Sequence, residues 1–329
     1  MTPPPHANDF LARHGWAGAR IVPLAGDASF RRYFRVHAAD GTTAVLMDAP
    51  PPHEDPRPFL HIAGHLHGIG LCAPAILAAE PEAGLVLLED FGDARLGPLL
   101  TSAPEREAAL YDQAIDVLVH LHRHPAPPGA RAYTLGEYRR EVDLFLEWWV
   151  PAAGLRVDAQ GWAAAWDEAL APLLAQPHGV LALRDYHADN LMVLEGRSGV
   201  RGLGLLDFQD ALAGHPAYDL VSLLQDARRD VTPQVQARGL ARLAAATGYD
   251  PETLRHACEL LGAQRNLKIV GIFTRLWRRD GKPAYLALLP RVWRHVERNL
   301  AHPATAPVAR WMAANVPPAL RLPDLRAAA

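Results

Sequence analysis

The sequence has only two cysteines and two lysines among its 329 residues. Cys72 and Cys258 lie far apart, without the spacing of a metal site or a redox pair, which favours a reducing compartment. No apolar run is long enough to cross a membrane, and the N-terminus lacks the basic and apolar segments of a signal peptide. We therefore expect a cytoplasmic protein with no membrane partner.

An excess of charge of one sign is also lacking, because 36 acidic residues stand against 33 arginines and lysines. A nearly balanced chain has no field suited to nucleic acid, so we expect no nucleic-acid partner. Nothing in the sequence indicates an obligate protein partner. Half of the residues are hydrophobic, which is enough for one large core or for two lobes.

The densest group of chemically useful residues lies between positions 180 and 210. Apolar runs predict three short strands, and a turn sequence at 196–199 predicts that the last two strands form a hairpin. Asp185 and Asn190 follow the first run, and Asp207 follows the third. Because a hairpin folds the chain back, we expect these three side chains to lie close together.

Phosphoryl transfer needs such a set of side chains. One carboxylate accepts a proton from the attacking hydroxyl, while an amide oxygen and a second carboxylate hold Mg²⁺ against the phosphates. The order Asp-x-x-x-x-Asn, hairpin, Asp-Phe resembles the catalytic loop and metal motif of protein kinases and aminoglycoside phosphotransferases. Three unrelated polar loop residues are the alternative, and the place of Asp207 beyond the hairpin argues against it.

The first 90 residues predict a small lobe rich in strands. We expect helices at 6–18 and 56–69, and strands at 21–24, 30–36, 43–47, 75–78 and 84–88. The loop Gly26, Asp27, Ala28, Ser29 has the layout of a phosphate-covering loop, with an ordinary β-meander as the alternative. In a kinase-like fold, Leu88, Glu89 and Asp90 would begin the link between the lobes and contact the adenine edge; a plain surface turn is equally compatible.

Beyond residue 95 the patterns predict mainly helices. Four capping signals predict helix starts, at Ser102, Thr134, Thr232 and Asp250. The second of these helices is expected to continue to about Val150. The segment 263–279 is basic on one side and apolar on the other.

This order of elements resembles the aminoglycoside phosphotransferase (APH) and choline-kinase-like superfamily over most of the chain. A narrower likeness, to the cell-wall amino-sugar anomeric kinases, rests on long strings: GDASFRRYFRV at 26–36, LMDAPP at 46–51, RDYHADNLM at 184–192, LLDFQDALAGHPAYDLVSLLQDAR at 205–228, QRNLKIVGIFTRL at 264–276 and RDGKPAYLALLPR at 279–291. The resemblance implies an α+β, protein-kinase-like fold of two lobes. Residues 1–90 would form a nucleotide-covering lobe with an antiparallel sheet and one helix. Residues 91–329 would form a mainly helical catalytic and sugar-binding lobe.

The same resemblance implies ATP-dependent phosphorylation of the C1 hydroxyl of N-acetylmuramate or N-acetylglucosamine, with Mg²⁺ as cofactor. It implies that Asp185 is the catalytic base and that Asn190 and Asp207 are Mg²⁺ ligands. His187 and Asp210 are nearby candidates for contacts with sugar or metal. Asp219 is expected to brace the catalytic loop rather than to act in catalysis.

The predicted strand at 43–47 departs from the superfamily pattern, because it lacks the phosphate-binding lysine, and the helix at 56–69 lacks the glutamate that would pair with it. Since both partners are missing, we expect another cation to replace them. Our hypothesis is that Arg31, Arg32 or Arg35 reaches the phosphates, because an arginine fork suits phosphate oxygens. Alternation along a strand makes Arg32 point opposite to the other two.

Sugar specificity is expected to come from the C-terminal region. Glu147, Trp148 and Trp149 offer a carboxylate and aromatic faces, and Arg265 and Lys268 could meet the lactyl carboxylate of N-acetylmuramate. A core tryptophan pair and a solvated basic face are the structural alternatives. A kinase of another small alcohol (aminoglycoside, choline or homoserine) and a nucleotide-binding pseudokinase remain open, although a basic segment at 263–298 favours a neutral or anionic acceptor.

Overall fold

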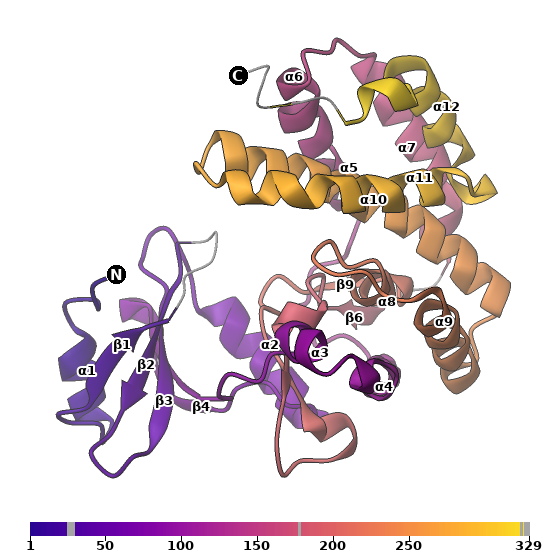
Figure 1. Cartoon of the computed structure of the whole chain (residues 1–329). Coiled ribbons are helices and arrows are strands. Elements are labelled where there is room, and N and C mark those ends of the chain that lie inside the picture. Colours follow the sequence, from indigo (N-terminus) through magenta and orange to yellow (C-terminus); the bar gives the residue numbers. More distant parts are fainter. Residues whose placement is uncertain (25–29, 177–178, 323–324, 326–329) are drawn as a thin grey trace. The chain divides into compact units, whose positions relative to one another are not determined.

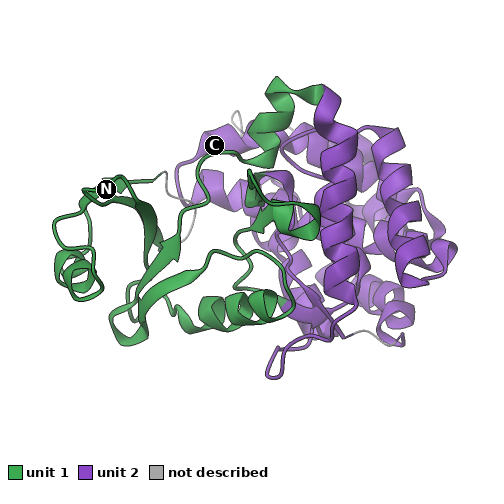
Figure 2. Ribbon diagram, turned by 90° about the horizontal axis from the view of Figure 1, so that it is seen from below, with its two compact units in different colours: residues 1–104, 189–211 green, residues 105–188, 212–329 purple. Residues whose placement is uncertain are grey.

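The computed structural model describes residues 1–24, 30–176, 179–322 and 325. Its internal contacts divide the chain into two compact units, coloured separately in Figure 2. The first unit comprises Met1–Pro104 and Asp189–Ala211, and the second comprises Glu105–Ala188 and Leu212–Ala329. The first unit thus takes in the central hairpin from the second half of the chain. The functional division at residue 90 stays a prediction.

The first unit contains a five-stranded antiparallel sheet with the order β1-β2-β3-β5-β4 (Figure 1). Each strand lies within two residues of its predicted position, and the bounds are β1 Arg20–Pro23, β2 Arg32–His37, β3 Thr43–Asp48, β4 Ile76–Glu80 and β5 Leu85–Glu89. Short apolar segments, and alternation at 30–36, therefore located these strands, although burial differs among them: four consecutive residues of β5 are buried, whereas no residue of β1 is fully buried.

One face of this sheet packs against helix α1 (Ala7–Arg13). Phe34 and Val36 of β2 belong to the same buried cluster as Phe10 and Leu11 of α1. Since side chains alternate along a strand, Arg32 lies on the α1 face of the sheet. Arg35 lies on the opposite face.

The rest of the first unit consists of short helices and the central hairpin. The bounds are α2 Arg57–Gly68, α3 Leu96–Ser102, β7 Leu191–Val193 and β8 Leu203–Leu205, with β7 and β8 paired antiparallel as predicted. Phe59 of α2 stacks on Phe208 just beyond the hairpin, with ring centroids 4.9 Å apart.

The predicted helix start at Ser102 is wrong. Ser102 ends α3, and its hydroxyl donates to the carbonyl of Leu99 at 2.9 Å instead of capping a new helix. A serine hydroxyl can bond back to the preceding turn as readily as it can cap the next one. A 3-10 turn at Pro104–Arg106 follows, and the next helix begins at Glu107.

The second unit is largely helical and holds one small antiparallel sheet. Its elements are α4 Glu107–His122, α5 Leu135–Val142, α6 Val150–Ala152, α7 Ala159–Leu174, β6 Val180–Ala182, β9 Leu212–Gly214, α8 Ala217–Leu224, α9 Pro233–Thr247, α10 Pro251–Arg278, α11 Leu289–Leu300 and α12 Ala306–Asn315. Three capping predictions are confirmed, because side-chain oxygens accept from the backbone amide three residues on at Thr134, Thr232 and Asp250.

The helix predicted to run to Val150 is interrupted. It ends at Val142, and Phe145–Trp149 form a π-helical turn. Trp149 is fully buried and packs on Phe145 and Trp293, so the wide turn aims a large side chain into the core.

Helix α10 forms the centre of the second unit and contacts α5, α8, α9 and α11. Its middle turns are buried, including the polar side chains of Gln264, Arg265 and Lys268. A solvated basic face is therefore the wrong interpretation of these residues. Among the described residues, no helix combines the length and apolar character needed to cross a membrane.

Candidate active site

The loop that carries Asp185 begins in a strained backbone conformation. Arg184 has φ +73°, a left-handed value that costs a non-glycine residue roughly 1–2 kcal/mol. The buried carboxylate of Asp219 in α8 accepts hydrogen bonds from the backbone amides of Leu183 at 2.6 Å and Arg184 at 2.8 Å. These two bonds hold the strained turn, so Asp219 braces the loop as predicted.

The side chain of Arg184 is anchored by a buried carboxylate, Glu141 of α5. Glu141 is 2% exposed and forms ion pairs with the Arg184 guanidinium and, at 3.0 Å, with Nζ of Lys268. It also accepts from the Tyr133 hydroxyl and, at 3.3 Å, from Nε2 of Gln264. Burial opposes its ionisation, but the charges of Lys268 and Arg184 and the hydroxyl hold the pKa of Glu141 to about 2.

Glu141 was missed in the sequence, although a signal exists. It lies between Tyr138 and Phe145 at helical spacing, and all three side chains are buried. A carboxylate on an otherwise apolar stripe must find a cationic partner, because an unpaired buried charge is costly. The sequence gives no indication that this partner lies on α10, more than 120 residues further along the chain.

Asp185 is the most accessible acid of this group. Its side chain is 44% exposed, and its Oδ1 lies 3.8 Å from Nη2 of the buried Arg265. Burial of the site disfavours its charge, but Lys268, Arg265 and then His187 and Arg184 lower its pKa overall. Asp185 is therefore ionised at neutral pH and can accept a hydrogen bond from a hydroxyl group.

His187 follows two residues later and is 7% exposed. Its Nε2 lies 3.4 Å from Nη1 of Arg228. Burial, followed by the charge of Arg228, lowers the pKa of His187 to about 3, so the imidazole is neutral at physiological pH. Its contact with sugar or metal stays a prediction.

The two predicted metal ligands lie together in the first unit, at the open end of the hairpin. The amide of Leu206 donates to the carbonyl of Asn190 at 3.0 Å, which places Asn190 and Asp207 on adjoining ends of the paired strands. Asp207 has φ +57°, and Nε2 of Gln209 donates to its Oδ1 at 2.8 Å. Among the described residues, Arg184 and Asp207 are the non-glycine positions with positive φ, and such strain gathers at functional sites.

An amide and a carboxylate fit Mg²⁺ better than a softer metal. Mg²⁺ is commonly held by one or two protein carboxylates together with substrate phosphates and water. In the described part of the chain, no three histidine, cysteine, aspartate or glutamate side chains gather in an arrangement suited to a metal. Asn190 and Asp207 therefore suit a cation that arrives with a nucleotide. Asp185 belongs to the other unit, so the convergence of all three side chains stays a prediction.

The three candidate arginines have different partners within the first unit. Arg32 pairs with the buried Asp48 at 2.7 Å, and Arg35 pairs with Asp90 at 2.7 Å. Nε of Arg31 lies 3.6 Å from Glu54, and both side chains are largely buried. All three candidate arginines therefore already have a carboxylate partner within the first unit.

Arg31 lines a cavity of about 300 Å³ in the first unit, and Asp210 lies on its wall. The full lining consists of Arg31, Pro52, His53, Glu54, Asp55, Pro58, Gln209 and Asp210. Gln209 is also the residue that bonds to Asp207, so the cavity adjoins the proposed metal ligand. The predicted phosphate-loop residues Gly26, Asp27, Ala28 and Ser29 lie outside the described residues.

The predicted adenine-contacting segment ends strand β5. Leu88 is buried in the sheet, and Glu89 accepts from the amide of Ala75 at 3.2 Å and pairs with Arg197. Asp90 is held by Arg35. The contact with adenine stays a prediction.

The predicted sugar-binding residues differ in exposure. Glu147 is exposed, Trp148 is half-buried with an unpartnered indole N–H, and Trp149 belongs to the core. Lys268 is bonded to Glu141, and Arg265 faces Asp185. Sugar contacts by these residues stay predictions.

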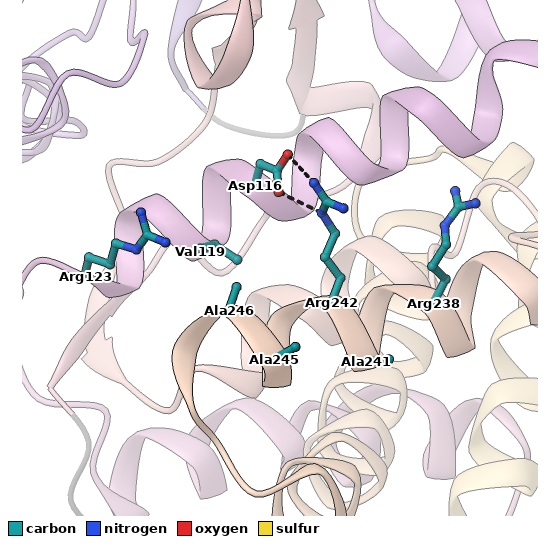
Figure 3. Close-up of a pocket in the computed structure, with 8 residues that line it drawn as sticks. All are labelled: Asp116, Val119, Arg123, Arg238, Ala241, Arg242, Ala245 and Ala246. Atoms are coloured by element: carbon teal, nitrogen blue, oxygen red, sulfur yellow. Dashed lines mark hydrogen bonds and ion pairs between the residues drawn. The ribbon is translucent and has the colours of Figure 1, made fainter.

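A cavity in the second unit is lined by none of the predicted site residues. It measures about 570 Å³ between α4 and α9 (Figure 3). Arg242 on its wall forms two 2.7 Å bonds to Asp116, and Arg238 pairs with Asp112 at 2.9 Å. Carboxylates therefore already pair with two of the three arginines that line this cavity.

Solved structures share this fold at low sequence identity. The choline kinase LicA from Streptococcus pneumoniae matches with a TM-score of 0.63 and 14% identity, covering 86% of this chain and 94% of that one. A complex of the aminoglycoside phosphotransferase APH(2")-IIa with streptomycin and ATP matches with a TM-score of 0.58 and 14% identity, covering 92% and 98%. The fold is therefore α+β and kinase-like, with an N-terminal five-stranded sheet followed by a largely helical region.

Sequence comparison defines the family. The model of the phosphotransferase enzyme family (APH) matches residues 20–261. The chain is 37% identical to an N-acetylmuramate/N-acetylglucosamine kinase of Caulobacter vibrioides, over 94% of this chain and 95% of that protein. It is 38% identical to the protein of the same name from Pseudomonas aeruginosa, over 89% and 88%. The chain belongs to the APH phosphotransferase enzyme family.

Proposed function

We propose that this protein transfers the γ-phosphoryl group of ATP to the anomeric (C1) hydroxyl of N-acetylmuramate, N-acetylglucosamine or both. The observation that carries the proposal is the agreement of relatives: those with 37–38% identity over about nine tenths of the chain are named as kinases of these sugars. A role in peptidoglycan recycling in the cytoplasm follows from the same likeness.

Asp185 acts as the catalytic base in this proposal. The C1 oxygen of the sugar bonds to the γ-phosphorus, the bond from that phosphorus to the bridging oxygen of ADP breaks, and the hydroxyl proton passes to Asp185. The lowered pKa of Asp185 keeps it ionised, and the braced turn at Arg184 limits its movement. Positioning of this kind supplies a large part of the rate in phosphoryl transfer.

Asn190 and Asp207 hold Mg²⁺ in this proposal. When bound there, the cation supplies neutralisation of charge on the phosphate oxygens. The strained backbone of Asp207 and its bond from Gln209 fix the carboxylate before any ligand arrives.

Arg31 is the cation that replaces the missing lysine of β3. Its guanidinium lines the cavity beside the Asp207 turn, and Glu54 restrains it as a glutamate would restrain a lysine. Leu88, Glu89 and Asp90 contact the adenine, and Gly26–Ser29 cover the phosphates. His187, Asp210, Glu147 and Trp148 are the proposed sugar contacts.

The test is product analysis with purified protein and Mg-ATP. Each sugar is incubated separately, and ³¹P and ¹H NMR identify the position of the new phosphate. We expect a sugar 1-phosphate, and we expect no product from the methyl glycoside of N-acetylglucosamine, whose C1 oxygen is blocked. Phosphate at another hydroxyl, or on the methyl glycoside, contradicts an anomeric kinase.

A kinase of another small alcohol is the second candidate. The fold likeness to choline kinase and aminoglycoside phosphotransferase supports it. Turnover of choline, homoserine or an aminoglycoside without turnover of either amino sugar would favour it. ATP binding without turnover of any acceptor would favour a pseudokinase.

A further inference from the structure

Helix α10 places two cations beside the loop that carries Asp185. Nη2 of Arg265 lies 3.8 Å from Oδ1 of Asp185, and Lys268 follows on the next turn. The Arg265 side chain is 6% exposed, whereas that of Asp185 is 44% exposed. A buried guanidinium therefore supports a carboxylate that substrate can reach.

The two cations of α10 have different partners. Lys268 is bonded to Glu141 at 3.0 Å, so its charge is already matched by another carboxylate. For Arg265, Asp185 is the carboxylate within ion-pair distance among the residues that the structure describes. A buried charge needs such a counter-charge, because the interior solvates it poorly.

This inference rests on the proposed function and concerns the same site. We propose that Arg265 is a positioning residue for phosphoryl transfer, which fixes the charge and orientation of Asp185 and does not bind the sugar. The separation of 3.8 Å exceeds a hydrogen-bond length, so Arg265 acts on Asp185 through its charge. A carboxylate beside an arginine stays ionised to lower pH.

Other groups also face Asp185. They are Arg184 and His187 from its own loop, Lys268 from α10 and Asp219 from α8. His187 is neutral above pH 5, because its pKa is about 3. Lys268 also attracts Asp185, but removing its charge would leave Glu141 without one of its two cationic partners. Arg265 is therefore the side chain through which Asp185 can be perturbed selectively.

The experiment compares Arg265→Gln and Arg265→Lys with the wild-type enzyme. Arg255→Gln, an exposed change on the same helix, is the matched control. The pH dependence of kcat/KM is measured with N-acetylglucosamine, which has no carboxylate, and then with N-acetylmuramate. In Arg265→Gln we expect the acidic limb of the kcat/KM profile, which reports the protonation of Asp185, to move to higher pH by about one to three units with both sugars. Arg265→Lys should move it less, and the control should leave it unchanged.

The outcomes separate three roles of Arg265. An unmoved acidic limb in a folded Arg265→Gln protein overturns the proposal. A loss confined to N-acetylmuramate also overturns it, and assigns Arg265 to the lactyl carboxylate instead. If Arg265→Gln does not fold, Arg265→Lys carries the test: its shorter side chain moves the charge away from Asp185, so we expect a smaller upward shift of the acidic limb with both sugars, and an acidic limb identical to that of the wild type refutes the role. A wild-type enzyme inactive on both sugars would instead refute the proposed function.

Discussion

Replacing Glu141 with glutamine should destabilise the second unit strongly. The change keeps the shape of the side chain but leaves Lys268 and Arg184 opposite a neutral group. Breaking a buried ion pair by removing one partner typically costs about 3–5 kcal/mol. We expect a loss of this size in the free energy of unfolding at pH 7.

The pH dependence of the free energy of unfolding gives an independent check on the size of the Glu141 contribution. The pKa of Glu141 falls from 4.5 to about 2 in the folded protein. At 1.36 kcal/mol per unit, this shift corresponds to roughly 3 kcal/mol of stability. Because the folded pKa is the lower one, this contribution is fully present above pH 4.5 and is lost as the pH falls towards 2. The Glu141→Gln protein has no carboxyl group at this position, so it should not show this loss of stability between pH 4.5 and 2.

The assay is urea unfolding followed by tryptophan fluorescence. Trp16 is the one tryptophan of the first unit, and the other seven of the eight report on the second unit. Glu168→Gln is the control, because that exposed side chain pairs only at the surface with Arg310. A stability within about 1 kcal/mol of wild type at pH 7 would refute the reasoning from buried charge. Adding Lys268→Met should restore part of the loss, and a double-mutant cycle measures the coupling.

Three further changes test other parts of the molecule. Asp185→Asn should lower kcat by orders of magnitude, whereas the dissociation constant for ATP, measured by calorimetry, should stay close to that of the wild type. Retained turnover would show that Asp185 is not the base. Arg31→Ala should raise the KM for ATP at least tenfold, as expected for a charged phosphate contact worth about 1.5–3 kcal/mol. Arg13→Ala, a change at an exposed side chain, is the control and should leave the KM for ATP unchanged. Equal KM values for the two variants would exclude the phosphate contact. Gly271→Ala should lower the melting temperature of the second unit, since a Cβ there would lie 2.3 Å from a backbone carbonyl. Gly136→Ala is the control, because a Cβ at Gly136 would make only ordinary van der Waals contacts. Similar melting temperatures for the two variants would contradict the close packing of α10.

The sequence predicted the parts of the fold that depend on local pattern. The strand β2 follows alternation, and the other four strands of its sheet follow short apolar segments. The caps at Thr134, Thr232 and Asp250 follow from a side chain that reaches an amide three residues away. The helix start predicted at Ser102 was wrong because its hydroxyl donates a hydrogen bond to a carbonyl of the preceding turn instead.

The site was predictable only where it is local. The hairpin brings Asn190 and Asp207 together through neighbouring residues, so spacing in the sequence was sufficient. The support of Asp185 comes from Glu141, Asp219 and Arg265, which lie on three different helices. Such contacts depend on how distant segments pack, and no local pattern records them.

The interrupted first unit has a consequence for how the chain acquires its structure on the ribosome. Its sheet is complete by residue 104, yet the hairpin that belongs with it ends at residue 211. At roughly 5–20 residues per second, translation separates these two points by about 5–20 seconds. During that interval the nascent sheet lacks its remaining partner, so chaperone binding and proteolysis should concentrate on this stage of synthesis.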